Sequence, residues 1–309
     1  MGVTESDYVS TMTGNIVATL GLSTAVLLLL KWLFRRTKKT PVKDKVVLIT
    51  GASSGLGEAC AQVFHQAGAK IILSARRREE LERVRDSLVR SNPGNVHEPK
   101  ILVLDLSDLE SMVGAAREAL TYFGSVDILI NNGGLSYRGD AAGTTVEVDQ
   151  RLMLVNYLGQ VALTKAILPS MIAANSGHIL AVSSIQGRIA IPHRSAYAAS
   201  KHALQAFMDS LRAELSSTGI KVSVLIPGYI NTNLSLNALT GSGDKYNQLD
   251  ATTLSGMSAP YVASRILSMV ESGREELVLA PVAHKVAIYM RTLLPALYFY
   301  AMSKRAQKN

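Results

Sequence analysis

A short apolar run followed at once by a glycine-rich turn constrains the fold more than any other feature of the chain. Lys45–Thr50 reads KVVLIT, a continuous apolar run typical of a strand buried on both faces of a parallel sheet. Gly51, Gly55 and Gly57 follow, and the pattern of Glu58–Ala67 predicts a helix. Such glycines let a backbone approach a pyrophosphate, and the N-terminus of the helix attracts its charge. We therefore predict a dinucleotide site here.

The next predicted strand ends in arginines, where many dinucleotide sites carry an acid. Ala69–Ala75 is apolar enough for a buried strand, and Arg76, Arg77 and Arg78 follow it. An acid at this place would bind the ribose 2′-hydroxyl of NAD, whereas guanidinium groups can hold a 2′-phosphate. Alternatively, some of these arginines open the next predicted helix, 79–91, on its solvated face. We expect NADP(H) to be the preferred cofactor, with NAD(H) as the alternative.

A second group of polar residues lies between Ala181 and His202, which reads AVSSIQGRIAIPHRSAYAASKH. Tyr197 and Lys201 stand four residues apart in a predicted helix, so their side chains leave the same face. Ser184 ends the apolar strand before that helix, where a parallel sheet presents its ligands. A neighbouring positive charge lowers the pKa of a tyrosine. The three groups therefore suit proton transfer to a carbonyl oxygen.

A tyrosine and a lysine at helical spacing are weak evidence when taken alone. Such a pair is more often an aromatic at the edge of the core beside a solvated charge. Two further motifs strengthen it: TGASSGLG at residues 50–57 lies upstream, and NNGG at 131–134 lies between. With these motifs in this order, residues 45–280 resemble the short-chain dehydrogenase/reductase family. The resemblance implies NAD(P)-dependent interconversion of a ketone and a secondary alcohol.

The resemblance also implies a role for each catalytic residue. Tyr197 would donate the proton, Lys201 would lower the pKa of Tyr197 and hold the ribose, and Ser184 would orient the carbonyl. Substrate would therefore contact Ser184 and Tyr197. Asn156, within a predicted helix at 148–174, matches the family asparagine whose carbonyl holds a water linked to Lys201. The alternative for Asn156 is an ordinary surface asparagine.

The cofactor positions follow from the same resemblance. An acid placed like Asp105 lies beside the adenine, and Leu106 packs against that ring. The family usually has Ala where Gly133 stands, a loss of one methyl that should leave the turn intact. The PGxxxT turn after the sixth strand would reach the carboxamide or phosphate region. The predicted cofactor-binding residues are Gly51, Ser53, Ser54, Gly55, Leu56, Gly57, Arg76, Arg77, Asp105, Leu106, Asn132, Gly133, Tyr197, Lys201, Pro227, Gly228 and Thr232.

The expected fold is a doubly wound α/β sheet of about seven parallel strands, in the order 3-2-1-4-5-6-7 by family resemblance. We predict the third strand at 101–106 and the next helix at 108–123, with Ser107 as its N-cap. Residues 231–260 are rich in Asn, Ser, Thr and Gly and contain scattered Leu. Loops of this length in compact domains are usually functional, and we expect this one to shape the substrate pocket.

The N-terminal region predicts a membrane anchor. Residues 8–30 carry no charge, and as a helix they would be about 34 Å long, enough to cross a bilayer core. A cleaved signal peptide would begin with basic residues, but this chain begins with Glu5 and Asp7. We therefore divide the chain into a tail at 1–7, an anchor helix at 8–34, a basic linker at 35–44 and a Rossmann domain at 45–280.

The charge distribution gives the expected topology. The formal net charge is +8, but the Lys and Arg residues gather beside apolar segments, which favours a membrane surface over nucleic acid. Seven basic residues lie within 31–45 and none precede the anchor, so we expect the domain to face the cytosol. A sequon at Asn233 would be used only in a luminal domain. We expect a single-pass protein of the endoplasmic reticulum membrane, with the peroxisomal membrane as the alternative.

The C-terminal segment, 281–309, is apolar beyond what the core needs. Arg291 and Pro295 argue against a membrane span there, so we expect an interfacial helix or a homodimer contact. A tail that covers the core is the alternative. Cys60 is the only cysteine and falls in an apolar helix pattern, and the six histidines are scattered. We therefore expect Cys60 to lie in the core and no metal to be bound.

Taken together, these features predict a membrane-anchored oxidoreductase that uses NADP(H) on a lipid-like ketone or secondary alcohol. The alternative from another class is a non-catalytic NADPH-binding regulatory or scaffold protein at a membrane. The presence of both Tyr197 and Lys201 argues against that alternative. A second alternative, NAD-dependent oxidation of an alcohol, is disfavoured by the arginines at 76–78.

Overall fold

A computed structural model describes Thr24 and residues 39–307 of the chain. The predicted anchor at 8–34 lies outside the described residues except for Thr24, so the anchor stays a prediction. The chain divides into two compact units at residues 39 and 40, and the second contains every described strand. It begins within the predicted linker: Val42 is buried, and the Thr40 amide donates to the Glu271 carbonyl over 2.8 Å.

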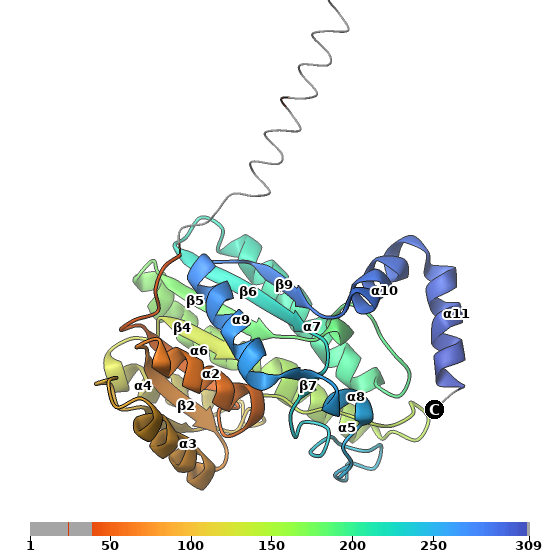
Figure 1. Cartoon of the computed structure of the whole chain (residues 1–309), viewed down its shortest axis with the longest axis horizontal. Coiled ribbons are helices and arrows are strands. Elements are labelled where there is room, and N and C mark those ends of the chain that lie inside the picture. Colours follow the sequence, from red (N-terminus) through yellow and green to blue (C-terminus); the bar gives the residue numbers. More distant parts are fainter. Residues whose placement is uncertain (1–23, 25–38, 308–309) are drawn as a thin grey trace, which may run out of the picture. The chain divides into compact units, whose positions relative to one another are not determined.

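Seven parallel strands form the central sheet in the order β3-β2-β1-β4-β5-β6-β9. This confirms the predicted Rossmann-like architecture, both in strand number and in order. Figure 1 shows the strands side by side between layers of helices. The strands are β1 Val46–Thr50, β2 Lys70–Ala75, β3 Lys100–Val103, β4 Ile128–Asn131, β5 Gly177–Val182, β6 Ile220–Pro227 and β9 Glu276–Leu279, with β7 Ile230–Asn231 and β8 Met257–Ser258 as a separate parallel pair.

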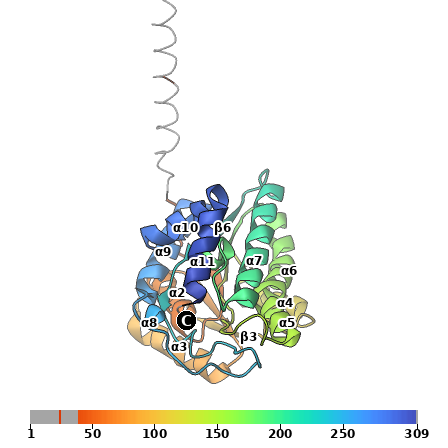
Figure 2. The same cartoon turned by 90° about the vertical axis from the view of Figure 1, so that its right-hand side faces the viewer.

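Helices cover both faces of the sheet, as the turned view in Figure 2 shows. One face packs α4, α6 and α7 around one apolar core, and the other packs α2, α3 and α9 around a second. The helices are α2 Gly55–Gln66, α3 Arg78–Ser91, α4 Met112–Phe123, α5 Val146–Met153, α6 Gly159–Ala173, α7 Ser195–Glu214, α8 Ala251–Leu254, α9 Ala259–Ser272, α10 Val282–Leu293 and α11 Pro295–Ala306.

The central strand β1 explains why the first apolar run of the sequence is continuous. All five of its residues are buried. Val46 and Leu48 belong to the core on one face, and Val47 and Ile49 belong to the core on the other. Because successive side chains of a strand point to opposite faces, a strand covered on both sides needs apolar residues at every position. Cys60 is fully buried in the second core, as the sequence predicted.

The third strand and the helix after it are shorter than predicted. β3 ends at Val103, and α4 begins at Met112 with Ser111 as its N-cap residue. The cause is Asp105, whose Oδ1 accepts hydrogen bonds from Ser107 N over 2.9 Å and from Ser107 Oγ over 2.7 Å. This local turn competes with both strand and helix. The expected N-cap role of Ser107 is therefore wrong.

A long helical segment after β4 is interrupted where Asn156 lies. α5 passes into a π-helical turn at Leu154–Leu158, and α6 continues from Gly159 to Ala173. Among the described residues, this segment is long and apolar enough by composition to cross a membrane. However, half of its most apolar window is buried in the domain. The apolar composition therefore reflects packing against the sheet and α4.

Candidate active site

One pocket of about 710 Å³ opens at the carboxyl ends of β1, β2, β4, β5 and β6. Parallel α/β sheets bind ligands at this edge. The pocket collects nearly every predicted site residue from segments that are far apart in sequence. Those that line it are Gly51, Ser53, Ser54, Gly55, Leu56, Arg76, Arg77, Asp105, Leu106, Asn132, Gly133, Ser184, Tyr197, Lys201, Pro227, Gly228 and Thr232.

Gly57 does not line the pocket, and its place in the fold explains why it is a glycine. A Cβ atom on Gly57 would lie 2.2 Å from the carbonyl oxygen of Gly51. Only glycine therefore lets the first turn of α2 pack against the turn that precedes it. Gly51 itself has a φ of +67°, a left-handed conformation that favours glycine. These glycines bring the N-terminus of α2 to the pocket, where it can attract a phosphate.

The turn after β4 is held against the glycine turn by Thr50. The Thr50 hydroxyl oxygen accepts hydrogen bonds from the amides of Asn132 and Gly133, each over 3.0 Å, and donates to the Ile130 carbonyl. The Asn132 side chain donates to the Thr50 carbonyl over 2.9 Å. A Cβ on Gly133 would lie 2.7 Å from Cδ1 of Leu106. The turn is therefore intact without the usual alanine, as predicted, and a Leu106 methyl lies against Gly133.

The phenol, ammonium and hydroxyl groups that the sequence singled out meet in this pocket. Tyr197 and Lys201 leave the same side of α7, and Lys201 Nζ is 5.9 Å from the centre of the Tyr197 ring. Lys201 Nζ also donates to the Val182 carbonyl at the end of β5 over 2.9 Å. Ser184 follows β5, its Oγ accepts a hydrogen bond from the Gln186 amide over 3.1 Å, and its hydroxyl is close enough to the Tyr197 phenol to lower the pKa of that phenol. All three residues are at most 8% exposed, so their polar groups face a restricted space.

Burial changes the protonation behaviour of the two ionisable groups. It lowers the pKa of Lys201 to about 8. It raises the pKa of the Tyr197 phenol, an effect that the nearby Ser184 side chain and the positive charges of Arg138 and Arg194 offset only in part. The direction at Tyr197 is opposite to the lowering that we expected from Lys201. The reason is that a phenolate loses its hydration when the ring is buried. Tyr197 therefore stays protonated at neutral pH.

Asn156 is fully buried, so the surface alternative is wrong for this residue. Its Oδ1 accepts from the Leu135 amide over 2.7 Å, and its Nδ2 donates to the Leu135 carbonyl and to Ser200 Oγ. A Cβ on Gly134 would lie 2.9 Å from Asn156 Oδ1 and 3.8 Å from Lys201 Nζ. The asparagine and the lysine thus converge on one glycine. π-Helical turns often occur at functional sites, but the water link to Lys201 stays a prediction.

The three arginines after β2 make different contacts. Arg76 Nη1 lies 4.0 Å from Asp105 Oδ2, and Arg77 Nη2 donates to Ser53 Oγ over 3.4 Å. Burial opposes ionisation of Asp105, but the hydrogen bonds from Ser107 and the charge of Arg76 lower the pKa of Asp105 below its ordinary value. Arg78 is the first residue of α3. Two guanidinium groups therefore lie at the pocket, one of them near a carboxylate.

An ion-pair cluster that the sequence did not reveal ties the segment 231–260 to the pocket wall. Arg138, which is on the pocket wall, forms a salt bridge with Asp250, and Arg194 Nη2 lies 3.8 Å from the same carboxylate. Burial, together with the charge of Arg138, lowers the pKa of Arg194 to about 10. Leu239 also pairs with Tyr137 in an isolated bridge. No periodic pattern or motif marks these positions in the sequence.

The comparisons with known proteins give the family. Residues 45–241 match the family model described as short chain dehydrogenase. The chain belongs to the short-chain dehydrogenase/reductase family, whose fold binds NAD(P), and it is an oxidoreductase of that family. Similar chains include "Dehydrogenase/reductase SDR family protein 7-like" of Anopheles gambiae, 53% identical over 95% of this chain and 94% of that protein. "Dehydrogenase/reductase SDR family member 7B" of Mus musculus is 49% identical over 91% and 87%.

Solved structures resemble the described domain as well. An alcohol dehydrogenase from Thermococcus sibiricus, complexed with 5-hydroxy-NADP, has a TM-score of 0.66 at 26% identity and covers 76% of this chain and 95% of that chain. A short chain dehydrogenase/reductase from Burkholderia phymatum, in complex with NAD, has a TM-score of 0.73 at 23% identity and covers 84% and 96%. At that identity the second likeness shows the fold alone.

Proposed function

We propose that the protein is an NADP(H)-dependent oxidoreductase that interconverts a lipophilic ketone and a secondary alcohol at a membrane. The observation that carries this proposal is the convergence of Tyr197, Lys201 and Ser184 in one pocket that also contains the glycine turn and two arginines. The first three groups suit a carbonyl oxygen. The glycine turn and the arginines suit a phosphate-bearing dinucleotide.

Each catalytic residue has a separate role in the reduction of a ketone. NADPH, when bound, would supply the hydride to the carbonyl carbon. Tyr197 donates its phenolic proton to the carbonyl oxygen, and its raised pKa keeps that proton in place at neutral pH. Ser184 donates a hydrogen bond to the same oxygen and so stabilises its developing charge. Lys201 would hold the ribose, and a water held by Asn156 would carry a proton from solvent through Lys201 to the Tyr197 phenolate.

The preference for NADP(H) rests on the residues at the end of β2. Two guanidinium groups line the pocket there, and Asp105, an acid of the same wall, has its Oδ2 4.0 Å from Arg76 Nη1. An acid that faces a guanidinium group is a poorer ligand for a ribose 2′-hydroxyl, whereas an arginine at this place can bind a 2′-phosphate. The structure with 5-hydroxy-NADP, at 26% identity, supports the same choice.

Three single substitutions test the preference. Arg76→Ala and Arg77→Ala should each weaken NADPH binding about 10-fold to 100-fold, because a charge-assisted hydrogen bond contributes about 1.5–3 kcal/mol. Binding of NADH should change little, since it has no 2′-phosphate. Fluorescence titration of the reduced nicotinamide measures both. Arg78→Ala is the matched control, because Arg78 opens α3. Equal weakening of both cofactors, or an equal loss in the control, would show the assignment to be wrong.

The proposal of a lipophilic substrate rests on the apolar side chains in the pocket wall. Leu135, Val155, Leu234 and Leu239 all line the pocket, and two of them come from the segment that the Arg138–Asp250 pair holds in place. A panel of long-chain, steroid and short water-soluble ketones, scored by NADPH consumption with the purified full chain, tests this. The proposal expects turnover with the first two classes. A non-catalytic scaffold would bind NADPH and consume none with any ketone.

The proposed membrane topology rests on the sequence of residues 1–45. Basic residues follow the uncharged stretch and acids precede it, so we propose that the catalytic domain faces the cytosol. The proposed location is the endoplasmic reticulum membrane, with the peroxisomal membrane as the alternative. In sealed microsomes, added protease should digest the catalytic domain without detergent. Protection of the domain until detergent is added, or a glycan on Asn233, would place it in the lumen instead.

A further inference from the structure

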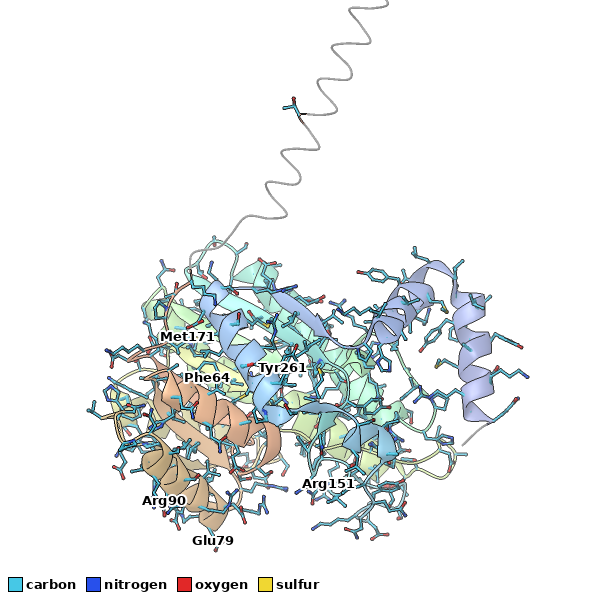
Figure 3. All side chains as sticks on the ribbon, viewed as in Figure 1. Phe64, Glu79, Arg90, Arg151, Met171 and Tyr261 are labelled. Atoms are coloured by element: carbon cyan, nitrogen blue, oxygen red, sulfur yellow. The ribbon has the colours of Figure 1, made fainter. Side chains whose placement is uncertain are left out.

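The helix pair α10–α11 exposes a concentration of large apolar side chains. Four of those on α10 follow each other at i, i+4, i+7 and i+11 and so share one face of the helix. In a helix that packs on its own domain this face would point inward, but here it faces outward, and Figure 3 shows the side chains of the pair projecting into open space. The exposed residues are Val282, Val286, Tyr289, Leu293, Leu294, Leu297, Phe299 and Tyr300.

The pair touches the rest of the domain through one buried side chain, although most of its surface is exposed. Tyr298 is the one buried residue of α11, and its hydroxyl donates to the Ala190 carbonyl in the loop before α7. Arg291 on α10 lies 4.8 Å from the centre of the Phe299 ring and 6.0 Å from that of Tyr298, which joins the two helices. Because α10 has no buried residue and α11 has only Tyr298, the alternative of a tail that covers the core is wrong.

The charge of this segment favours a lipid surface over a second copy of the chain. No Asp or Glu follows Glu276, whereas five basic residues do: Lys285, Arg291, Lys304, Arg305 and Lys308. Two such surfaces, each basic and without an acid of its own, would repel each other in a symmetric dimer. An anionic bilayer complements the charge, and aromatic side chains beside basic ones are typical of the level of the lipid headgroups.

We propose that the α10–α11 face lies on the surface of an anionic bilayer, as a membrane contact separate from residues 8–34. Lys304 Nζ lies 5.7 Å from the centre of the Tyr300 ring, so a cation and an aromatic ring would enter the headgroup region together. The opposite side of α10 adjoins the active site: the ring of His284 lies 6.2 Å from that of Tyr229, which lines the pocket, between centroids. The contact would hold the pocket beside the lipid and is independent of the catalytic assignments.

A fluorescent label on the full chain tests the contact. Cys60 is fully buried, so an environment-sensitive label can be placed at Leu297→Cys alone. Val113→Cys on α4 is the matched control, since Leu297 and Val113 are 51% and 53% exposed. In phosphatidylcholine vesicles that contain phosphatidylserine, the label at 297 should shift to the blue and be quenched by brominated lipid. The label at 113 should show neither change, and removal of phosphatidylserine should weaken the signal at 297.

Charge reversal separates lipid attraction from plain apolar contact. Lys285→Glu and Lys304→Glu should each lower the equilibrium constant for docking at least about fivefold, the factor expected for one basic residue at an anionic surface. Lys165→Glu, an exposed lysine of α6, should leave it unchanged. Equal quenching at both label positions, or no dependence on phosphatidylserine, would overturn the proposal. A blue shift that instead follows the protein-to-lipid ratio would assign the face to a second copy and overturn it too.

Discussion

Tyr197→Phe should abolish ketone reduction while NADPH still binds. The substitution removes only the phenolic O–H, so the proton donor is lost and the ring that packs in the pocket is kept. General acid catalysis by a positioned side chain contributes about a hundredfold to ten-thousandfold, and we expect turnover to fall by at least that lower factor. NADPH consumption with an accepted ketone measures the first effect. Fluorescence titration of NADPH, expected to change less than about threefold, measures the second.

The matched control is Tyr122→Phe. Tyr122 also has a hydrogen-bonded hydroxyl, which donates to the Ile101 carbonyl over 2.8 Å, but it is not among the residues that form the pocket wall. Loss of its hydroxyl should leave turnover unchanged. If Tyr197→Phe retained full activity, Tyr197 would not be the proton donor. If NADPH binding were lost in parallel with turnover, the phenol would be needed for the cofactor rather than for the chemistry.

Patterns with a short period predicted the buried strands, the glycine turn and the helical spacing of Tyr197 and Lys201, whereas the order of the sheet and the roles of the site residues were implied by the family resemblance. Buried parallel strands such as β1 need apolar residues at every position, and the glycine turn must follow the strand directly. The positions of Tyr197 and Lys201 depend on helical spacing alone. Each of these local signals lies within a few residues of the feature it determines, but only the family resemblance implied which of these features meet in the fold.

The sequence-based predictions were wrong or incomplete where side-chain hydrogen bonds determine the backbone conformation or where segments distant in sequence come into contact. Asp105 ends β3 early because its carboxylate accepts hydrogen bonds from Ser107, a choice that an apolar pattern does not encode. The π-helical turn at Asn156 and the Arg138–Asp250 pair depend on partners 21 and 112 residues away. The pKa of Tyr197 rises because of its burial, which became known only from the packing.

Because the pKa of Lys201 is low, we expect the charged form of this lysine to destabilise the folded state. A pKa of about 8, against 10.5 for an ordinary lysine, corresponds to about 3 kcal/mol against folding at pH 7, where both folded and unfolded chains carry the charged form. Lys201→Met keeps most of the volume and removes the charge. It also leaves the Val182 carbonyl without its donor, which costs about 1–2 kcal/mol. In the absence of cofactor, the variant should therefore be about 1–2 kcal/mol more stable, and inactive.

The pH dependence of the free energy of unfolding distinguishes removal of the buried charge from better packing of the methionine. As the pH rises from about 8 to 10.5, folded Lys201 is already neutral while the unfolded lysine still binds a proton, so the stability of the native protein rises with pH in this window. The Lys201→Met variant lacks this gain, so its higher free energy of unfolding at pH 7 should shrink relative to that of the native protein and become lower by pH 10.5. Urea unfolding of both proteins in mild detergent at pH 7 and 10.5 measures the two differences.

The control is Lys221→Met, at an exposed position of β6, whose free energy of unfolding relative to that of the native protein should not change between the two pH values. If the Lys201→Met variant were less stable than the native protein at pH 7, the buried lysine would be a net contributor to stability and its low pKa would be wrong.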